Sequence, residues 1–469
     1  MDSRYKRLGK NTALVFMGSA GSKIITLLML PYYTRILSTA DYGLSDLIAT
    51  YASIMTSVVS CCIADAIFVF PKNADRENQK KYFSSGFVFS IASYALWAII
   101  TLIVSCVGGG GTITSYAWWI YAMTISYAIQ GYLQQFNLGT DKMVVYSTTG
   151  IVQVGGMAIL AFVLMPEYGL QGYLLSIMIA NIIAAIFSLA ASKSYNFFSL
   201  GLIDKFHLTE LLKYGIPLIP NTIMWWIVNG INRPIMEANL GLDAIGIYAV
   251  ANKLPAVITM LFGVFSSAWG VTLLEEFGKS DFNRFFNKTM KVIFFGIAIF
   301  TVLFILGSKL IVRVFAAPEF FDAWRYVPVL SEGVLLSCMS GLIGGIFSAE
   351  KKSKYFFYSS IWGAGSSLVL TLLGVKMMGL MGVCLAVAFS FLVMVVVRLS
   401  YAWKHINLFS VRYYTIMILL VTVVSAVVIL SESLVYTLLT GLVAVSIMIL
   451  MNRQELSGLL QLVKSRIKR

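Results

Sequence analysis

The stretch PEYGLQGYLL at residues 166–175 has a counterpart in KMMGLMGVCL at residues 376–385, and this pair decides how the rest of the chain is organised. Residues 131–189 align with residues 341–399 without a gap, and both segments carry GLxG at the same place. Each segment has the same order of basic loop, apolar span, GLxG and second apolar span. Weak internal symmetry of this kind is typical of membrane transporter folds built from repeats.

A second, looser pairing extends the symmetry toward the front of each half. It sets Leu37 on Leu240 and Gly43 on Gly246. Some of this identity can arise by chance, because Leu and Gly are common in apolar segments. The two pairings together predict a chain built from two related halves.

The composition also indicates a membrane protein. Of the 469 residues, 59% are hydrophobic and 12% are charged, and the mean hydropathy is +0.83, whereas soluble chains carry about 25% charged residues. The net charge of +14 comes from short basic clusters between long apolar runs, so there is no basic soluble domain that could hold a nucleic acid. We therefore expect no nucleic-acid partner and a chain that lies in the lipid bilayer.

Apolar runs of about 20 residues predict an all-α integral membrane fold. We expect about 14 transmembrane helices, arranged as two pseudo-symmetric six-helix bundles plus a C-terminal helix pair. The expected spans are 11–35, 43–69, 83–107, 113–135, 143–165, 168–191, 214–236, 244–272, 291–316, 326–348, 355–377, 379–402, 413–431 and 433–451, with short hairpins at Pro166 and Met378. The corresponding domains are 1–200, 201–408 and 409–469, the last with a basic cytoplasmic tail.

The distribution of basic residues predicts the orientation. With a cytoplasmic N-terminus, 27 of the 35 lysines and arginines fall in inside loops or tails, among them Arg398. Only Arg35, Arg233, Lys309, Arg313, Arg325 and Lys376 fall outside. Since cytoplasmic loops carry the excess of Lys and Arg, both termini are expected in the cytoplasm.

Several classes of chemistry find no support. There is no GxxxxGK[ST] phosphate loop, and the two histidines, His207 and His405, lie far apart in predicted cytoplasmic loops. The five cysteines fall in apolar segments without metal-type spacing, and we expect them to be buried. The external loops are short, which argues against a membrane enzyme that polymerises or ligates glycans. We expect no catalytic residue, no metal and no cofactor.

The strongest candidates for function are basic residues at membrane depth. Lys23 lies about halfway along the first expected span, Lys253 lies in the eighth, and Arg233 lies near the outer end of the seventh. A charge at the bilayer centre costs at least about 2.5–3.5 kcal/mol, so such residues usually face a water-filled cavity or a partner. Arg233 could instead reach the outer interface by snorkelling, and Lys253 could pair with Asp46 or Glu237. A cavity with basic residues at depth selects an anionic substrate.

Polar and aromatic residues near these cations complete the candidate site. The acidic residues Asp46 and Asp65, near the two ends of the second span, are expected to be charge partners, with an ion-coupling role as the alternative. Four prolines at the start of the second half predict kinked helices that could act as hinges. The candidate substrate-binding residues are Lys23, Lys253, Arg233, Asn229, Asn232, Trp225, Trp226 and Tyr248, and the prolines are Pro217, Pro220, Pro234 and Pro255.

Three stretches resemble a known family over nearly the whole chain. LPYYTRILSTADYGLSDL at 30–47 and the run from YGIPLIPN to YAVANKL at 214–254 are similar to bacterial oligosaccharide flippases of the Wzx type. The run 319–328 resembles the entry to the tenth helix in that family. The superfamily also holds lipid II flippases and multidrug exporters. Lys23 and Lys253 look equivalent to cavity arginines of the lipid II flippases, and lysine gives up the bidentate phosphate contact that arginine makes.

The resemblance implies a carrier rather than an enzyme. It implies movement of a polyprenyl-diphosphate-linked oligosaccharide from the cytoplasmic to the outer leaflet of the bacterial cytoplasmic membrane, for capsule, O-antigen or exopolysaccharide synthesis. The mechanism would be alternating access of a cationic central cavity, and Trp225, Trp226 and Tyr248 could stack on sugars. The partners would be the lipid-linked substrate, the bilayer, and a polysaccharide polymerase with other assembly proteins. A multidrug or cation antiporter, a lipid II flippase and a glycan polymerase or ligase remain as alternatives, and the sugar and the coupling ion stay open.

Overall fold

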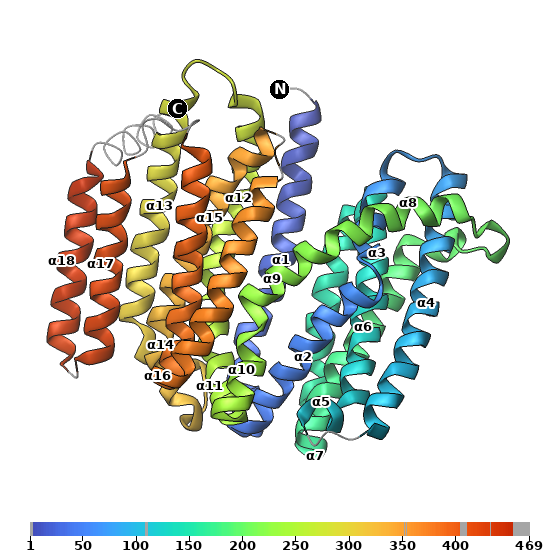
Figure 1. The fold of residues 1–469 in the computed structure, drawn as a ribbon, viewed down its shortest axis with the longest axis horizontal. Helices are drawn as coiled ribbons and strands as arrows, with labels where there is room; N and C mark the ends of the chain where they lie inside the picture. Colours follow the sequence, from blue (N-terminus) through green and yellow to red (C-terminus); the bar gives the residue numbers. More distant parts are fainter. Residues whose placement is uncertain are drawn as a thin grey trace. The chain divides into compact units, whose positions relative to one another are not determined.

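The computed structural model describes residues 3–107, 111–350, 352, 354–403, 410–431 and 433–453. The expected inside loop with His405 and the basic tail that follows Arg453 lie outside these residues. Across the described chain the secondary structure is helical, which confirms an all-α fold. Figure 1 traces the helices in chain order.

The chain divides into two compact units, Met1–Gly246 and Ile247–Arg469. Long helices joined by short 3₁₀ turns form the first unit. Its elements are α1 (Ser3–Ile36), α2 (Thr39–Val59), α3 (Ile63–Val69), η1 (Phe70–Asn73), α4 (Arg76–Val107), α5 (Thr112–Ser115), α6 (Ala117–Gly139), α7 (Met143–Ser192), η2 (Ser194–Phe197), η3 (Leu200–Leu202), α8 (Lys205–Gly215), η4 (Ile216–Leu218), α9 (Ile219–Gly230) and α10 (Asn232–Leu240).

Long helices also form most of the second unit, and α11 runs into it from the first. Its elements are α11 (Leu242–Lys253), α12 (Ala256–Glu276), α13 (Phe282–Leu306), α14 (Ser308–Phe315), η5 (Pro318–Arg325), α15 (Val327–Ala349), α16 (Lys354–Ala402), α17 (Val411–Leu430) and α18 (Leu434–Met451). Among the described residues of the whole chain, eight helices are long and apolar enough to cross a membrane, or nine if α2 and α3 count as one bent span. This is a multi-pass membrane protein.

The helices α7 and α16 are hairpins of two arms rather than straight rods. In α7 the Gln153 amide donates to Asn181 Oδ1 at 2.8 Å, although the residues are 28 positions apart and would lie about 42 Å apart along a straight helix. In α16 the Arg398 Nε donates to Ser359 Oγ at 3.1 Å across 39 positions. Each long helix therefore folds back on itself.

The two hairpins turn at equivalent glycines. Gly169 has φ 50° and ψ −122°, and Gly379 has φ 57° and ψ −135°, a region that glycine adopts without steric cost. The sequence placed these turns three residues and one residue earlier, at Pro166 and Met378. The two glycines are separated by the offset of the sequence alignment, so the two hairpins turn at aligned positions.

The arms of each hairpin touch through a second pair of glycines. A Cβ on Gly172 would lie 2.3 Å from the Leu164 carbonyl oxygen, and a Cβ on Gly382 would lie 2.0 Å from the Gly374 carbonyl oxygen. These contacts are with backbone atoms, which cannot move aside as a flexible side chain can. We expect Gly172→Ala and Gly382→Ala each to lower the free energy of unfolding by about 1–3 kcal/mol, measured by thermal unfolding of the protein in detergent.

The repeats also supply the control. Gly155 and Gly365 are equivalent to each other, and a Cβ on either would meet nothing within 4 Å. Gly155→Ala and Gly365→Ala are expected to leave stability unchanged or to raise it by about 0.5–1 kcal/mol, because alanine restricts the unfolded chain. If these two variants lose as much stability as the first pair, close approach of the arms is not the cause.

A reciprocal contact within the first unit confirms the looser pairing at the front of the halves. A Cβ on Gly43 would lie 2.0 Å from the Leu242 carbonyl oxygen, and a Cβ on Gly246 would lie 1.9 Å from the Thr39 carbonyl oxygen. Gly43 and Gly246 are aligned, and Thr39 and Leu242 are aligned with the same offset. The N-terminal turns of α2 and α11 therefore meet through equivalent residues, as in a two-fold symmetric contact.

The second span is broken where the sequence predicted one continuous helix over 43–69. Helix α2 ends at Val59 and α3 begins at Ile63, with a bend of 59° between them. Cys61 and Cys62 both have φ 53°, which costs L-residues about 1–2 kcal/mol each. Their amides still bond to the carbonyls of Val58 and Ser57 at 3.1 and 2.8 Å, as a membrane interior requires.

The expectation that all five cysteines are buried was wrong in two cases. Cys61 is half-buried because it lies in this break, and Cys106 is exposed near the end of α4. A cysteine side chain is as stable in lipid as in the protein interior, so hydropathy alone could not distinguish a lipid-facing cysteine from a buried one.

The four prolines lie at the starts of helices and not at kinks within them, which differs from the prediction. Pro217 lies in the first turn of η4 and Pro220 in the first turn of α9, while Pro255 caps α12 directly after α11 ends. Pro234 is the third residue of α10. At the start of a helix the missing N–H costs nothing, so these prolines set new helix starts rather than kinks within helices. Their action as hinges stays a prediction.

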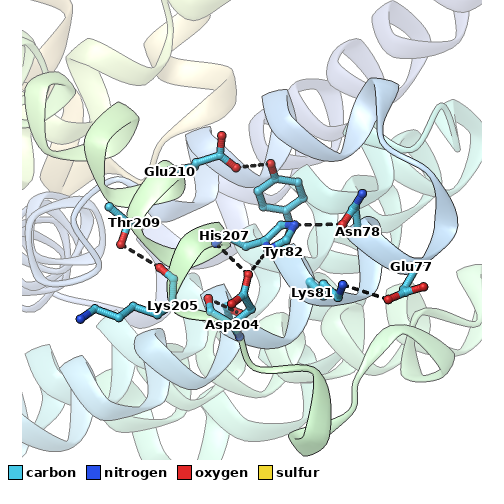
Figure 2. Close-up of polar contacts among 10 residues, drawn as sticks. Glu77, Asn78, Lys81, Tyr82, Asp204, Lys205, His207, Thr209 and Glu210 are labelled. Atoms are coloured by element: carbon cyan, nitrogen blue, oxygen red, sulfur yellow. Dashed lines mark hydrogen bonds and ion pairs between the residues drawn. The ribbon is translucent and has the colours of Figure 1, made fainter.

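Helix α8 is attached to the beginning of α4 by polar side chains (Figure 2). His207 contacts Asp204 through Nδ1 and lies 3.0 Å from Asn78 Oδ1 through Nε2, and the Tyr82 hydroxyl donates to Glu210 Oε2 at 2.5 Å. His207 is buried. The sequence placed His207 in a loop; it lies instead in the first turn of an amphipathic helix packed on the protein.

The contact between Asp204 and His207 predicts that the stability of the protein depends on pH. Hydrogen bonds from the His207 side chain and backbone lower the pKa of Asp204. A carboxyl with a lowered folded-state pKa adds stability above its ordinary value of about 3.9 and loses that stability as the pH falls through the folded-state value. We expect the melting temperature of Asp204→Asn to lie below that of wild type at neutral pH. We expect the difference between the two melting temperatures to narrow below about pH 4. A difference that stays constant on acidification would contradict this role of Asp204.

Candidate functional site

An ion pair joins α2 to α10 in the first unit. Arg233 Nε lies 3.0 Å from Asp46 Oδ2, and the side chains are 9% and 18% exposed. The same guanidinium contacts the Asn229 carbonyl oxygen through Nη1 and donates to Asn232 Oδ1 at 2.9 Å. A buried guanidinium requires such acceptors around its five N–H groups. The arrangement fixes α10 against the middle of α2.

This pair decides between two expectations for the charges. The sequence allowed Lys253 to pair with Asp46 and allowed Arg233 to snorkel outward. The structure pairs Asp46 with Arg233, and Arg233 is buried at 7% exposure instead of snorkelling. The pairing of Lys253 stays a prediction. Asp46 is thus a charge partner, as expected, but of a different cation.

The aromatic and amide residues of α9 lie beside this pair. The Trp226 indole donates to the Thr50 carbonyl oxygen of α2 at 3.1 Å, so this ring helps to hold α9 in place. Trp225 is 38% exposed. Asn229 is also exposed, and its amide donates to the Trp225 carbonyl oxygen at 2.9 Å. Trp225 and Asn229 therefore present side chains away from the protein, one turn apart on α9.

The two candidate lysines, Lys23 and Lys253, have different surroundings. Lys23 is exposed on α1, next to Ser22, which lies against α7 at Gly150. Lys253 is half-buried and is the last residue of α11. The carbonyl end of a helix favours a cation. Both positions suit a cation that is to act on an anion.

The remaining candidates lie elsewhere. Asp65 is exposed on α3, beyond the bend that separates it from Asp46. Tyr248 is buried at 1% exposure in the part of α11 that belongs to the second unit. The structure thus gathers Asp46, Arg233, Asn229, Asn232 and the two tryptophans, and it does not bring Asp65 into that cluster.

One buried charge was missed by the sequence analysis, which placed Arg398 in an inside loop. Arg398 lies in the second arm of α16 at 2% exposure. Its Nη1 donates to the Ser340 carbonyl oxygen at 2.7 Å, and its Cζ lies 4.8 Å from the centroid of the Phe356 ring. The repeat offers the signal that could have found it, because the aligned residue in the first half is Ser188, a neutral partner of Asn137 at 2.7 Å.

The described residues hold no group of three His, Cys, Asp or Glu side chains that could bind a metal ion. The cluster around Arg233 offers one carboxylate and amide groups, with no neighbouring nucleophile and base pair. The chemistry available here is charge recognition and hydrogen bonding.

Comparisons with solved structures identify the fold. The lipid II flippase MurJ in an inward closed conformation matches with a TM-score of 0.66 at 16% identity, over 95% of this chain and 99% of that one. A MATE transporter of Vibrio cholerae matches with 0.56 at 13% identity, over 85% and 97%. A transporter of the MOP superfamily from Pyrococcus furiosus, whose title describes a binding pocket of reverse polarity, matches with 0.56 at 12% identity, over 86% and 96%.

Sequence comparisons identify the family. An uncharacterized membrane protein of Methanocaldococcus jannaschii is 24% identical over 409 residues, which cover 81% of this chain and 94% of that protein. The model of the family described as "Polysaccharide biosynthesis protein" matches residues 8–269, more than half of the chain. The chain is therefore a multi-pass membrane protein of the polysaccharide biosynthesis protein family, with the fold of MurJ and of the MATE transporters.

Proposed function

We propose that this protein moves a polyprenyl-diphosphate-linked oligosaccharide from the cytoplasmic to the outer leaflet of a bacterial cytoplasmic membrane. Family membership supports a role in polysaccharide biosynthesis, and the fold supports a carrier. The product would supply capsule, O-antigen or exopolysaccharide assembly, where a polymerase and other assembly proteins would take it over.

The observation that carries this proposal is the exposed side chain of Lys23, which lies halfway along the first expected span. An amine at this depth costs at least about 2.5–3.5 kcal/mol unless water or an anion meets it. The side chain is exposed and not packed away, so we infer that it faces a water-filled path. A second amine, Lys253, is the last residue of α11. A lysine amine suits a phosphate of a lipid diphosphate.

The membrane potential can favour such export. Moving an anion outward from a negative interior is favourable by about 2.3 kcal/mol per charge per 100 mV. The glycan and the diphosphate cannot cross hydrocarbon unaided, whereas the polyprenyl tail is soluble in it. A carrier that alternates access between leaflets therefore needs only a polar path for the head group.

We assign different tasks to the other candidates. Arg233, with Asp46 and Asn232, would hold the structure around the path, while Asn229 and Trp225, which are exposed, would contact the sugars. Trp226 would support those contacts from behind, because its indole is already bonded to α2. Tyr248 is buried and would act through the packing of α11. Asp65 is left as the candidate for ion coupling.

We also propose the full topology of about 14 spans with both termini in the cytoplasm. Counting each arm of α7 and α16 as one span, and each broken pair (α2 with α3, α9 with α10, α11 with α12) as one, supports this number. The repeats would then form six-helix bundles within 1–200 and 201–408, followed by the helix pair α17 and α18 in 409–469.

A multidrug or cation antiporter remains the second candidate, because the MATE structures match the fold. Such a carrier needs an unpaired carboxylate at membrane depth. Asp46 forms an ion pair with Arg233, which favours an anionic cargo.

The direct test is reconstitution of the purified protein in liposomes that contain a fluorescent polyprenyl-diphosphate oligosaccharide. Accessibility of the sugar to an external membrane-impermeant quencher reports translocation. We expect the labelled lipid of the inner leaflet to become accessible to the quencher in protein-containing vesicles and not in protein-free vesicles. Equal rates in the two preparations would refute the proposed function, and bond formation between sugars would indicate a polymerase or ligase instead.

A further inference from the structure

The first unit contains an apolar slot of about 300 Å³ that the proposed transport path does not use. It is lined by Phe83 and Phe87 of α4, by Leu133 of α6, by Ile182 and Leu189 in the second arm of α7, and by Phe198. Polar surface is nearly absent from it. Ile182 and Ile186, which also line it, are 46% and 61% exposed. The slot therefore opens sideways on a face that meets lipid.

Two cations lie at one end of this slot. Lys142 Nζ is 5.2 Å and Arg76 Cζ is 5.9 Å from the centroid of the same ring, Phe197, whose neighbour Phe198 lines the slot. Lys142 Nζ also donates to the Ser192 carbonyl oxygen at 2.6 Å. Ser192 is three residues beyond Leu189, about 4.5 Å along the helix. The cations thus lie about one helical turn from the apolar lining.

These cations have no carboxylate partner within the described parts of the chain. Ion pairs here join Lys81 to Glu77 and His207 to Asp204, and none involves Lys142 or Arg76. Burial, and then the charge of Arg76, lowers the pKa of Lys142, as expected for two cations that are close together. Two neighbouring positive charges repel each other, so an anion between them would relieve that repulsion.

We propose that the slot and the two cations bind one anionic phospholipid of the surrounding membrane. An acyl chain would occupy the slot, and the phosphate would be recognised by Arg76 and Lys142. Basic pockets between helices at the cytoplasmic end of spans are known to suit anionic lipid head groups. We commit to a bilayer phospholipid because the slot opens to the bilayer, where phospholipids far outnumber any carrier lipid and occupy the site by mass action.

Such a lipid would join elements that are far apart in the chain. Its chain would contact α4, α6 and the second arm of α7, and its head group would contact the beginning of α4 and the residue before α7. Since a ligand that binds only the folded protein stabilises it, the lipid would strengthen the first unit without taking part in transport.

The test uses the full-length protein in a neutral detergent with added phosphatidylglycerol or phosphatidylcholine. Native mass spectrometry counts bound lipids, and thermal unfolding reports stabilisation. We expect phosphatidylglycerol to be retained more tightly than phosphatidylcholine and to raise the melting temperature. We expect Arg76→Gln with Lys142→Gln to weaken this binding about thirtyfold, since each basic residue near a membrane surface contributes about fivefold. The exposed Arg76 can also be changed alone, in case Lys142→Gln disturbs the start of α7.

Two matched controls separate this site from general effects of charge and bulk. Lys205 is exposed on α8 and points away from the neighbouring polar contacts (Figure 2), so Lys205→Gln removes one charge without touching the slot. Ile183 is 41% exposed on the same arm as Ile182 but does not line the slot. Ile182→Trp should obstruct lipid binding, whereas Ile183→Trp should not.

Three results would overturn the proposal. The first is equal retention of the two phospholipids by wild type. The second is unchanged phosphatidylglycerol binding in Arg76→Gln and in the double variant. The third is displacement of phosphatidylglycerol by a polyprenyl diphosphate at a much lower concentration, which would make this a site for the carrier lipid. None of these results depends on whether the vesicle assay shows translocation.

Discussion

Replacing Lys23 and Lys253 together by glutamine is expected to slow translocation of a lipid-linked oligosaccharide by at least about a hundredfold. A hydrogen bond to a charged group contributes about 1.5–3 kcal/mol, so each lysine that contacts phosphate accounts for about a tenfold to hundredfold effect. Lys23 is exposed, so we expect its replacement to leave the packing of α1 intact. The measurement is the initial rate in the liposome assay, at equal amounts of folded protein.

The control for this experiment removes a positive charge at another place in the chain. Lys205→Gln removes one positive charge from the exposed face of α8 and should transport at the wild-type rate. Lys23→Arg and Lys253→Arg keep the charge and should retain most activity. If the double glutamine variant transports as fast as wild type, the site assignment is wrong even though the protein is a carrier. A cation antiporter predicts this tolerance together with a loss of function at Asp46.

Breaking the ion pair between α2 and α10 is expected to have the largest effect on stability. Asp46→Ala leaves the Arg233 guanidinium, 7% exposed, without its carboxylate. Removing one member of a buried pair costs about 3–5 kcal/mol, and we expect the lower end because the Asp46 side chain is 18% exposed. The measurement is unfolding in detergent, followed by the fluorescence of the neighbouring Trp225 and Trp226.

A double-mutant cycle tests whether the loss arises from the pair itself. Asp46→Ala with Arg233→Met removes both charges, and we expect it to be more stable than Asp46→Ala alone, with a coupling energy of at least about 1 kcal/mol. We also expect this double variant to transport, because the pair supports the path without carrying the substrate. Additive losses of stability would show that the two charges do not stabilise each other. A folded double variant that cannot transport would show that the pair takes part in transport.

Much of the fold could be predicted because the membrane constrains it strongly. A segment in hydrocarbon must satisfy its own backbone hydrogen bonds, so apolar runs translate into helices, and the hairpin glycines Gly169 and Gly379 lie within three residues of the predicted turns. The break at Cys61 and Cys62 could not be predicted. Neither residue has the backbone freedom of glycine or the fixed φ of proline, and the surrounding packing imposes the left-handed conformation.

The site was harder to predict because its partners are distant in the sequence. Arg233 and Asp46 are 187 positions apart, and hydropathy shows only that each is a polar residue near the end of a span. The sequence named only Lys253 as a possible cation for Asp46, and the pair with Arg233 depends on the packing of α10 on α2. Arg398 lay close enough to the end of an apolar run to be read as part of a loop, although it is buried.

Accessibility of single cysteines at positions 23 and 253 tests the central claim most directly. In a background without the five native cysteines, Lys23→Cys and Lys253→Cys would be treated with a membrane-impermeant thiol reagent, with and without a polyprenyl-diphosphate oligosaccharide. The account predicts that both thiols react from water and that the lipid-linked substrate protects them. Thiols that react only with membrane-soluble reagents, whether or not substrate is present, would contradict a water-filled cationic path.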